Sequence, residues 1–573
     1  MVATMERVQP RLTLAVEDIA PHTQTLRSLD WDRSRFDIEF GLQNGTTYNS
    51  FLIRGDRVAL VDSSHEKFRQ IYLDALQGLI DPQSIDYLIV SHTEPDHSGL
   101  TRDLLALNPN LTVVGSKVAI QFLENLVHQD FQKMLVKSGS VLDLGQGHVL
   151  EFVSAPNLHW PDTIFTYDRG TQTLYTCDAF GMHYCSEATF DEDLTTIEED
   201  FRYYYECLMA PNARSVLAAL KRMGDLGPIT TIATGHGPLL RHHLTEWTHR
   251  YQDWSQAQTK AQTTVGVFYV SDYGYSDRLS QAIAHGITKV GVNVEMVDLR
   301  TTEPQDLTEI VGTLAGFVIG TLPSQGNETA HTALNTLLAL ATDKQAVGLY
   351  DSYGGDDEPI DTPLAQCRDA GLKVAFPSIR VKETPQEGIY QLCEESGTDL
   401  AQWLTRDKAI QKMKSLDSDL DKALGRISGG LYILTAIKGD MQGAMLASWV
   451  AQASFEPLGF TVAVAKDRAI EALMQVGDRF ALNILAEDTY QPLMKHFLKR
   501  FPPGADRFAG IKTRTATNGS PILVDALAYL ECEVVTRLEC SDHWVVYAQV
   551  NQGKVSNPEA LTAAHHRKVA NHY

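Results

Sequence analysis

The spacing of the short apolar runs changes twice along this sequence, near residue 262 and again near residue 425. A single hydrophobic core stops growing at roughly 250 to 300 residues, so a chain of 573 residues requires more than one core. We therefore predict domains at residues 1–262, 263–405 and 425–573. Residues 406–424 are charged and helix-prone, which fits an interdomain linker and fits an ordinary surface helix nearly as well.

The first block opens with alternating, strand-like segments and then places short apolar runs between helical stretches. This pattern predicts a layered domain that mixes α and β structure. The clearest runs are Asn49–Ile53, Arg57–Asp62, Ile85–Val90, Leu111–Val114 and Ile229–Ala233.

From Thr264 the chain alternates regularly between strand-like and helix-like segments. Such alternation predicts a doubly wound parallel sheet of the flavodoxin type, with a first helix at about Asp277–Lys289. The expected strands are Val265–Val270, Val292–Leu299, Gly316–Gly320, Ala346–Tyr350 and Lys373–Phe376. Beyond Gly425 the strand-like runs lengthen into hairpins, as in Gly430–Ala436 and Phe460–Ala465, which predicts a β-rich third domain shaped as a barrel.

Composition excludes several classes of function. The net charge of −23 and the lack of a basic run argue against a nucleic-acid partner. No run approaches the roughly 20 apolar residues of a membrane span, and the N-terminus does not resemble a signal peptide, so we expect a cytoplasmic protein. Seven cysteines without a C-x-x-C pair predict reduced thiols rather than disulfides, a zinc finger or a rubredoxin-type centre.

Four potential metal ligands occur within the six residues His92-Thr93-Glu94-Pro95-Asp96-His97, directly after the apolar run that ends at Val90. A rigid strand followed by a short loop lets such side chains converge, although a solvated turn would also explain this motif taken alone. Three further residues, His159, Asp178 and His236, also follow strand-like runs. We expect each of the three to project from the same edge of a sheet and to complete a metal site.

This set of residues resembles that of the metallo-β-lactamase fold, whose usual loop is H-x-H-x-D-H. Glu94 stands where hydrolases of that fold have a second histidine. The H-x-E-x-D-H loop with a downstream His, Asp and His is similar to that of flavodiiron proteins. A carboxylate makes the site richer in oxygen, which suits iron better than zinc.

The resemblance to flavodiiron proteins implies a ligand set. It implies that one iron is bound by His92, Glu94 and His159, that the other is bound by Asp96 and His236, and that Asp178 bridges the two. His97 is a further candidate ligand, because this position is a ligand in some members. His183 is expected near the oxygen pocket as a hydrogen-bond donor to the site.

A phosphate loop is predicted after the first strand of the middle block. The residues Ser271, Asp272, Tyr273, Gly274, Tyr275 and Ser276 match the flavodoxin pattern S/T-x-x-G-x-S/T, with which hydroxyls and backbone N–H groups would hold the FMN phosphate at a helix N-terminus. Asp272 and Asp277 place negative charge close by, which implies either weaker binding or outward-pointing side chains. A plain strand–turn–helix junction explains the loop about as well.

Two later strand ends strengthen the FMN prediction, because ligands of doubly wound sheets bind where strands end. By the resemblance these segments flank the isoalloxazine ring, with Tyr353 as the candidate for stacking. The residues concerned are Leu322, Pro323, Ser324, Gln325, Ser352, Tyr353, Gly354 and Gly355.

The segment Met445–Pro457 is similar to the flavin reductase family. Ser448, Trp449 and Ser454 are the candidate contacts of a second flavin, FMN or FAD, although a strand with small residues for packing is the alternative. Asn483 and the tail from His565 to Tyr573 also fit that family.

The resemblance runs through three consecutive blocks and identifies the chain as a diflavin flavodiiron protein with a C-terminal flavin reductase domain, as in cyanobacteria. It implies that NAD(P)H reduces the C-terminal flavin, that FMN of the middle domain passes electrons on, and that a di-iron centre reduces O2 to water. A flavin is required because nicotinamide gives two electrons together, whereas iron accepts one at a time.

Several alternatives stay open at this point. The same site could reduce nitric oxide, the metallo-β-lactamase fold could carry a zinc-dependent hydrolase, and a third class is an electron-transfer partner that has lost its metal. The resemblance also implies a head-to-tail homodimer, or a hetero-oligomer with a paralogue. The choice between NADH and NADPH is left open by the sequence.

Overall fold

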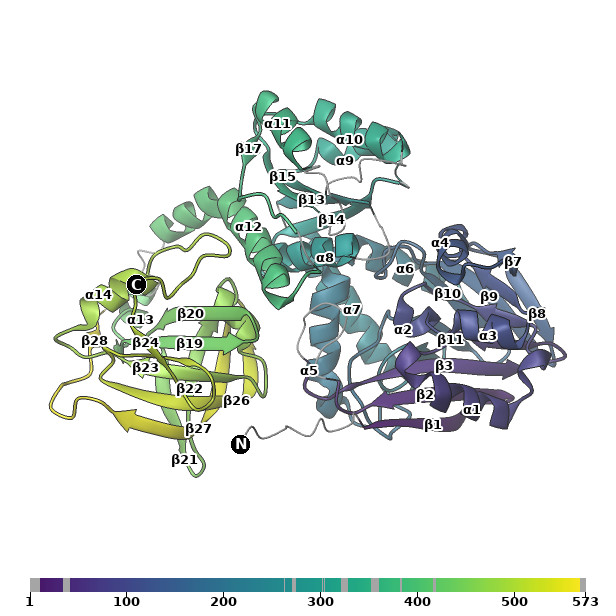
Figure 1. Ribbon diagram of the computed structural model, residues 1–573, viewed down its shortest axis with the longest axis horizontal. Coiled ribbons are helices and arrows are strands. Elements are labelled where there is room, and N and C mark those ends of the chain that lie inside the picture. The colour runs from purple at the N-terminus through teal and green to yellow at the C-terminus, as the bar shows by residue number, and fades with distance from the viewer. Residues whose placement is uncertain are drawn as a thin grey trace, which may run out of the picture. The chain divides into compact units, whose positions relative to one another are not determined.

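The computed structural model describes residues 11–33, 42–261, 263–270, 275–300, 302, 304–320, 328–351, 360–381, 384–415 and 419–566. The chain forms two compact units, and the first ends at Ala261 (Figure 1). No helix in these ranges combines the length and the apolar character that crossing a bilayer requires.

The first unit contains a seven-stranded sheet whose strands are adjacent in chain order from β1 to β7. Strands β1 to β4 are antiparallel, and β4 to β7 are parallel. The parallel half brings the carboxyl ends of β4 and β5 to one edge. The strands are β1 (Leu12–Ala20), β2 (Thr23–Asp30), β3 (Thr46–Arg54), β4 (Val58–Val61), β5 (Tyr87–Ile89), β6 (Thr112–Gly115) and β7 (Gln132–Leu135).

A second sheet of the same unit has the strand order β12-β11-β10-β9-β8. Strand β10 is antiparallel to both β9 and β11, and β12 is parallel to β11, so β9, β11 and β12 run in the same direction. Their carboxyl ends therefore lie at one edge, which confirms the edge predicted for the segments carrying His159, Asp178 and His236. The strands are β8 (Val141–Gly145), β9 (His148–Ser154), β10 (Ile164–Asp168), β11 (Thr173–Cys177) and β12 (Thr231–Thr234).

The two sheets pack face to face around one buried cluster, in which Phe51 of β3 and Tyr175 of β11 have ring centroids 5.0 Å apart. Helices α1, α3 and α4 cover the other face of the first sheet, and α6 contacts β9 of the second. This is the predicted metallo-β-lactamase-like αββα arrangement. The helices are α1 (Arg69–Leu79), α2 (Pro95–Ser98), α3 (Thr101–Leu107), α4 (Lys117–Val127), α5 (Leu194–Tyr204), α6 (Ala213–Gly224) and α7 (Leu244–Thr259).

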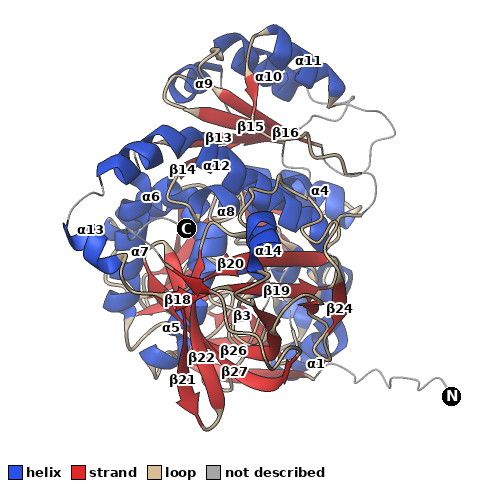
Figure 2. Ribbon diagram, turned by 90° about the vertical axis from the view of Figure 1, so that its left-hand side faces the viewer, coloured by secondary structure: helices blue, strands red, loops and turns tan. Residues whose placement is uncertain are grey.

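The second unit begins with a five-stranded parallel sheet of order β14-β13-β15-β16-β17. This is the doubly wound order that the alternating sequence predicts. Figure 2 shows α9, α10 and α11 on one side of this sheet and α8 and α12 on the other. The strands are β13 (Thr264–Tyr269), β14 (Asn293–Asp298), β15 (Gly316–Gly320), β16 (Ala346–Tyr350) and β17 (Lys373–Val374); the helices are α8 (Tyr275–Thr288), α9 (Pro304–Val311), α10 (Glu328–Leu340), α11 (Asp361–Asp369) and α12 (Glu387–Ser415).

Helices α8 and α12 cross closely, and two glycines permit the approach. A Cβ at Gly286 would collide with the backbone carbonyl of Glu394, and a Cβ at Gly397 would collide with that of Ile283. Helix α12 extends to Ser415, so it includes the first residues of the predicted linker, and α13 (Asp419–Leu424) covers its end.

The C-terminal part of the second unit is a seven-stranded antiparallel sheet of order β20-β19-β23-β26-β27-β22-β21. Met445 of β20 and Phe460 of β22, from near opposite edges, share one buried cluster, so the sheet curls around a single core as a barrel does. The strands are β19 (Tyr432–Lys438), β20 (Met441–Ala447), β21 (Val450–Phe455), β22 (Leu458–Ala465), β23 (Arg479–Ile484), β26 (Ala528–Cys540) and β27 (His543–Val555), with α14 at Tyr490–Phe497. Two short pairs complete the fold: β18 (Gly429–Gly430) with β28 (Ala564–His565), and β24 (Thr513–Thr515) with β25 (Pro521–Leu523).

Candidate metal centre and flavin sites

The predicted ligand loop leaves β5 and turns directly into the short helix α2, which begins at Pro95. Proline suits the first helical position, where a backbone N–H has no helical partner to lose. Two buried carboxylates hold the loop on either side of His92. Asp62 Oδ1 accepts a hydrogen bond of 2.7 Å from the backbone N–H of Ser91, and Asp162 Oδ2 accepts one of 2.9 Å from that of Thr93.

One group of potential ligands consists of His92, Glu94, His159 and Asp178, all buried. Glu94 Oε2 lies 2.8 Å from His159 Nε2 and 3.3 Å from His92 Nε2. Asp178 Oδ2 lies 3.0 Å from His92 Nε2 and 3.2 Å from His159 Nε2. Two imidazole nitrogens and two carboxylates thus converge, as a metal ion requires.

A second group consists of Asp96, His97 and His236. The Nε2 atoms of His97 and His236 lie 3.1 Å apart, and Asp96 Oδ2 lies 3.3 Å from His236 Nε2. Asp96 Oδ1 is buried and accepts no hydrogen bond from any residue of the described part of the chain. A buried anionic oxygen of this kind suits a cation.

Asp178 connects the two groups, because each of its carboxylate oxygens faces a different one. Oδ2 faces His92 and His159, as described above, whereas Oδ1 lies 3.0 Å from His97 Nε2 and 3.3 Å from His236 Nε2. A carboxylate in this position can be shared between two ions. His97 lies inside the cluster with the other predicted ligands.

The charges of the cluster favour bound cations. Burial alone lowers the pKa of a histidine, but Glu94 raises the pKa of His159 to about 9, and the carboxylates of Asp178 and Asp96, which accept hydrogen bonds from the His236 ring, raise that of His236 to about 10. Burial alone raises the pKa of a carboxyl, but His159 brings that of Glu94 down to about 2, and His92 and His97 hold that of Asp178 well below its ordinary value. The carboxylates are therefore charged. Their negative charge holds protons on the neighbouring histidines, and it would equally attract metal cations to this cluster.

The donor set fits iron. Imidazole nitrogens and carboxylate oxygens are ligands that iron accepts, and no thiolate-rich tetrahedral arrangement of the zinc-finger or iron–sulfur kind is present among the groups that the described residues form.

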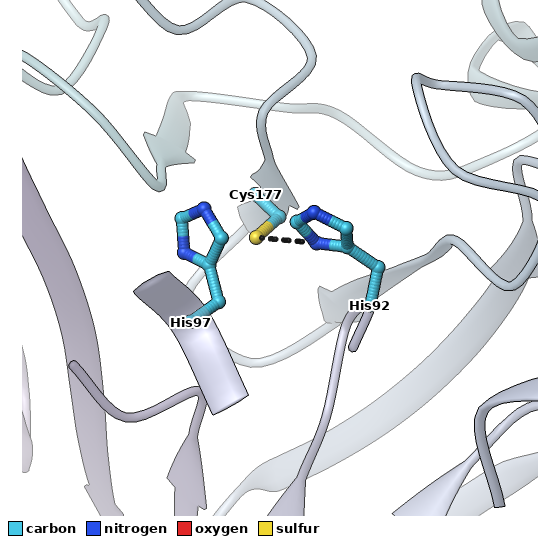
Figure 3. Close-up of side chains that lie close together, drawn as sticks. All are labelled: His92, His97 and Cys177. Atoms are coloured by element: carbon cyan, nitrogen blue, oxygen red, sulfur yellow. Dashed lines mark hydrogen bonds between the residues drawn. The ribbon is translucent and has the colours of Figure 1, made fainter. Parts of the chain in front are cut away.

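The ring nitrogens that face away from the cluster have different neighbours. Nδ1 of His236 lies 2.6 Å from the backbone oxygen of Thr47. Nδ1 of His92 lies 3.3 Å from Sγ of Cys177, the last residue of β11 (Figure 3). Such contacts orient an imidazole for metal binding.

His183 lies beside the cluster. Its ring centroid is 4.7 Å from that of His236 and 4.9 Å from that of Tyr204, and its Nδ1 is 2.7 Å from Thr46 Oγ1. Burial, reinforced by the charge of His236, holds the pKa of His183 well below its ordinary value. The ring is therefore neutral.

The FMN residues are only partly within the described structure. Ser271, Asp272, Tyr273, Gly274, Leu322, Pro323, Ser324, Gln325, Ser352, Tyr353, Gly354 and Gly355 lie outside the described residues. Tyr275 begins α8, and Ser276 is buried with its backbone oxygen 3.2 Å from the hydroxyl of Tyr350. Asp277 is buried in the first turn of α8, so an outward-pointing side chain is the wrong expectation for this residue; a helix N-terminus stabilises an acidic side chain there.

In the C-terminal domain, Ser448 is buried between β20 and β21, and the ring of Trp449 lies 5.2 Å from that of His543. The hydroxyl of Ser454 lies 2.8 Å from that of Tyr547 and 2.7 Å from the backbone oxygen of Pro457. Ser454 therefore helps to hold its hairpin together.

Sequence reasoning missed the residues that support the ligands: Cys177, Thr47, Asp62 and Asp162. None belongs to a motif, because each is identified only by a contact between distant segments. Asn483, which the sequence did single out, bonds the backbone of Ile433 and Leu523 through its side chain, so the contacts that the structure gives it are within the C-terminal domain.

Comparisons with known proteins agree with this architecture. Residues 46–237 match the model of the ODP family beta lactamase, and residues 424–571 match the model of the flavin reductase like domain. Putative diflavin flavoprotein A 3 of Nostoc sp. is 67% identical across 100% of both chains, and diflavin flavoprotein A 1 of Synechocystis sp. is 68% identical across 99% of both. The solved structure of the metal-soaked Flv1 flavodiiron core from Synechocystis sp. is 39% identical, covers 70% of this chain and 100% of its own, and has a TM-score of 0.66.

The sequence identity extends over all three predicted blocks rather than over one domain. This chain therefore belongs to the family of diflavin flavodiiron proteins, and it is an oxidoreductase with a di-iron centre, a flavodoxin-like FMN domain and a flavin reductase-like domain.

Proposed function

We propose that this oxidoreductase takes electrons from NAD(P)H and reduces O2 to water at the di-iron centre. The observation that carries the proposal is the Asp178 carboxylate, whose two oxygens face two separate groups of ligands. A pair of one-electron metals held close together can deliver several electrons to one small molecule, and the flavins convert the electron pairs of nicotinamide into single electrons.

We assign the ligands by these contacts. His92, Glu94 and His159 would hold one iron, Asp96, His97 and His236 the other, and Asp178 both. Glu94 distinguishes this site from that of a zinc-dependent hydrolase, because its charged oxygen next to His92 and His159 favours iron over zinc.

The surrounding residues have roles of their own in this proposal. Asp62 and Asp162 fix the ligand loop through the backbone N–H groups of Ser91 and Thr93, so that the donors are in place before an ion arrives. His183, neutral and next to His236, would donate a hydrogen bond from a ring N–H to a small molecule held at the centre, and would orient it there without changing its own charge.

In the second unit, the FMN would bind where β13, β15 and β16 end and α8 begins, because ligands of doubly wound sheets bind at that edge. The second flavin would lie in the C-terminal domain near Ser448 and Trp449. As the family resemblance implies, we propose a head-to-tail homodimer as the active form, in which the FMN of one subunit serves the irons of the other.

The test is anaerobic reduction of the purified full chain with NADH or NADPH, followed by addition of O2 or nitric oxide and measurement of the product. We expect rapid reoxidation by O2 with water rather than hydrogen peroxide as the product. Faster turnover with nitric oxide than with O2 would identify nitric oxide as the substrate. Stoichiometric zinc without iron would refute the redox function. Full activity of a dilute, strictly monomeric sample would refute the dimer.

A further inference from the structure

The two histidines His92 and His236 differ in what lies behind them. A neutral imidazole that binds a metal through Nε2 carries its proton on Nδ1 and donates it to a neighbour. For His236 the acceptor is the backbone oxygen of Thr47, at 2.6 Å. For His92 it is the sulfur of Cys177, at 3.3 Å (Figure 3).

Cys177 is held in this position by an unusual backbone. Its φ of 53° lies in the left-handed region, which residues other than glycine seldom adopt. The pairing of β11 with β12 is irregular at this point, and the carbonyl oxygen of Cys177 accepts a hydrogen bond of 2.7 Å from the backbone N–H of Gly235. A Cβ on Gly235 would lie 2.7 Å from His97 Cε1 and 3.1 Å from the carbonyl carbon of Cys177, so only glycine permits this packing.

Two consecutive residues therefore enclose the ring of His92. Asp178 Oδ2 faces Nε2 at 3.0 Å, and Cys177 Sγ faces Nδ1 at 3.3 Å. The sulfur is fully enclosed in the protein, since Cys177 is buried. One short segment thus fixes both the orientation of the ring and the environment of each of its nitrogens.

The nature of the acceptor affects the metal. The stronger the acceptor of the Nδ1 proton, the more electron density the imidazole gives to the ion, and a thiol sulfur is a weaker acceptor than a carbonyl oxygen. We propose that Cys177 is a positioning residue that orients His92 and keeps it a weaker donor than His236, so that the two irons are chemically unequal. This inference rests on the proposed di-iron assignment.

The experiment uses the full chain loaded anaerobically with iron and compares Cys177→Ala and Cys177→Ser with the parent. Cys367→Ala is the matched control, because it removes a buried thiol from the hydrophobic core of the FMN domain. The readouts are iron retention against a chelator and the EPR spectrum of the half-reduced, mixed-valent centre.

We expect Cys177→Ala to weaken iron retention about tenfold, the lower end of the effect of losing such a partner, and to change the EPR spectrum. Cys177→Ser supplies an oxygen acceptor, so it should recover much of the retention with a spectrum different from that of the parent. Cys367→Ala should match the parent in both.

Parental retention and an unchanged spectrum in Cys177→Ala would overturn the proposal, as would an unchanged spectrum in Cys177→Ser if the alanine variant does not fold. A sulfur-to-iron charge-transfer band in the parent that disappears in Cys177→Ser would also overturn it, because Cys177 would then be a ligand. A parent chain that binds no iron would refute the proposed function instead.

Discussion

Replacing Asp178 by asparagine removes one donor oxygen from a carboxylate that faces both groups of ligands. In the structure Oδ2 lies 3.0 Å from His92 Nε2, and Oδ1 lies 3.0 Å from His97 Nε2. An asparagine side chain keeps the size but offers one oxygen, and its NH2 group is a donor only. One of the two groups therefore loses its shared ligand.

The expected loss of iron affinity in Asp178→Asn follows from the position of this carboxylate between the two groups of ligands. Losing a residue that only hydrogen-bonds to a metal ligand costs about 10- to 100-fold in affinity. Asp178 faces the cluster itself, so we expect a loss of more than about 100-fold for one ion, or more than about 2.7 kcal/mol at about 1.36 kcal/mol per tenfold change. Iron content should fall from about two to about one per chain.

The assay is anaerobic loading, desalting and elemental analysis, followed by titration with a chelator. Asp168→Asn is the matched control, because Asp168 is a buried carboxylate of the same unit that contacts His148 Nδ1 at 2.7 Å and belongs to neither group. Parental affinity for both irons in Asp178→Asn would refute the reasoning that this carboxylate is shared.

Three further results are expected. Glu94→His should lower the ratio of iron to zinc retained after loading with both metals, as measured by elemental analysis, and unchanged O2 reduction would contradict the role of the carboxylate. Asp162→Ala leaves the N–H and the hydroxyl of Thr93 without their acceptor, at about 1–3 kcal/mol each, so the free energy of unfolding measured in urea should fall by about 2–6 kcal/mol. A fall of less than about 0.5 kcal/mol would show that Asp162 does not hold the ligand loop in place. Trp449→Ala should lower the flavin-to-protein absorbance ratio, whereas Phe455→Ala, at a residue 84% exposed on the neighbouring hairpin, should not; equal ratios would remove Trp449 from the flavin site.

Much of the metal centre could be predicted because strand direction determines where ligands meet. His159, Asp178 and His236 each follow a strand, and the strands β9, β11 and β12 prove to run in the same direction. The doubly wound sheet was predictable for a different reason. Its buried parallel strands are short, continuous apolar runs, which can be seen in the sequence. The pattern of apolar runs was enough to predict the sheet, and the positions of the potential ligands after those runs were enough to predict the metal centre.

The supporting contacts could not be predicted, because they depend on backbone geometry and on packing between distant segments. The sulfur of Cys177 contacts His92 from a residue with a left-handed backbone at the end of β11, and no sequence pattern specifies that conformation. The end of α12 is a different case. Residues 406–415 contain no proline or glycine to stop a helix, so α12 continues to Ser415 beyond the predicted end of the FMN domain.

The distribution of the ligands along the chain has a consequence for synthesis. The donors that share the first group with Asp178, which are His92, Glu94 and His159, all precede Asp178 in the chain, whereas the second group is complete only when His236 follows β12. During synthesis from the N-terminus, the first group of donors therefore leaves the ribosome before the last donor of the second. An ion bound to the first group would join the end of β5 to the ends of β9 and β11, two separate sheets, and would act as a cross-link that holds the sandwich together while the remainder of the domain is added.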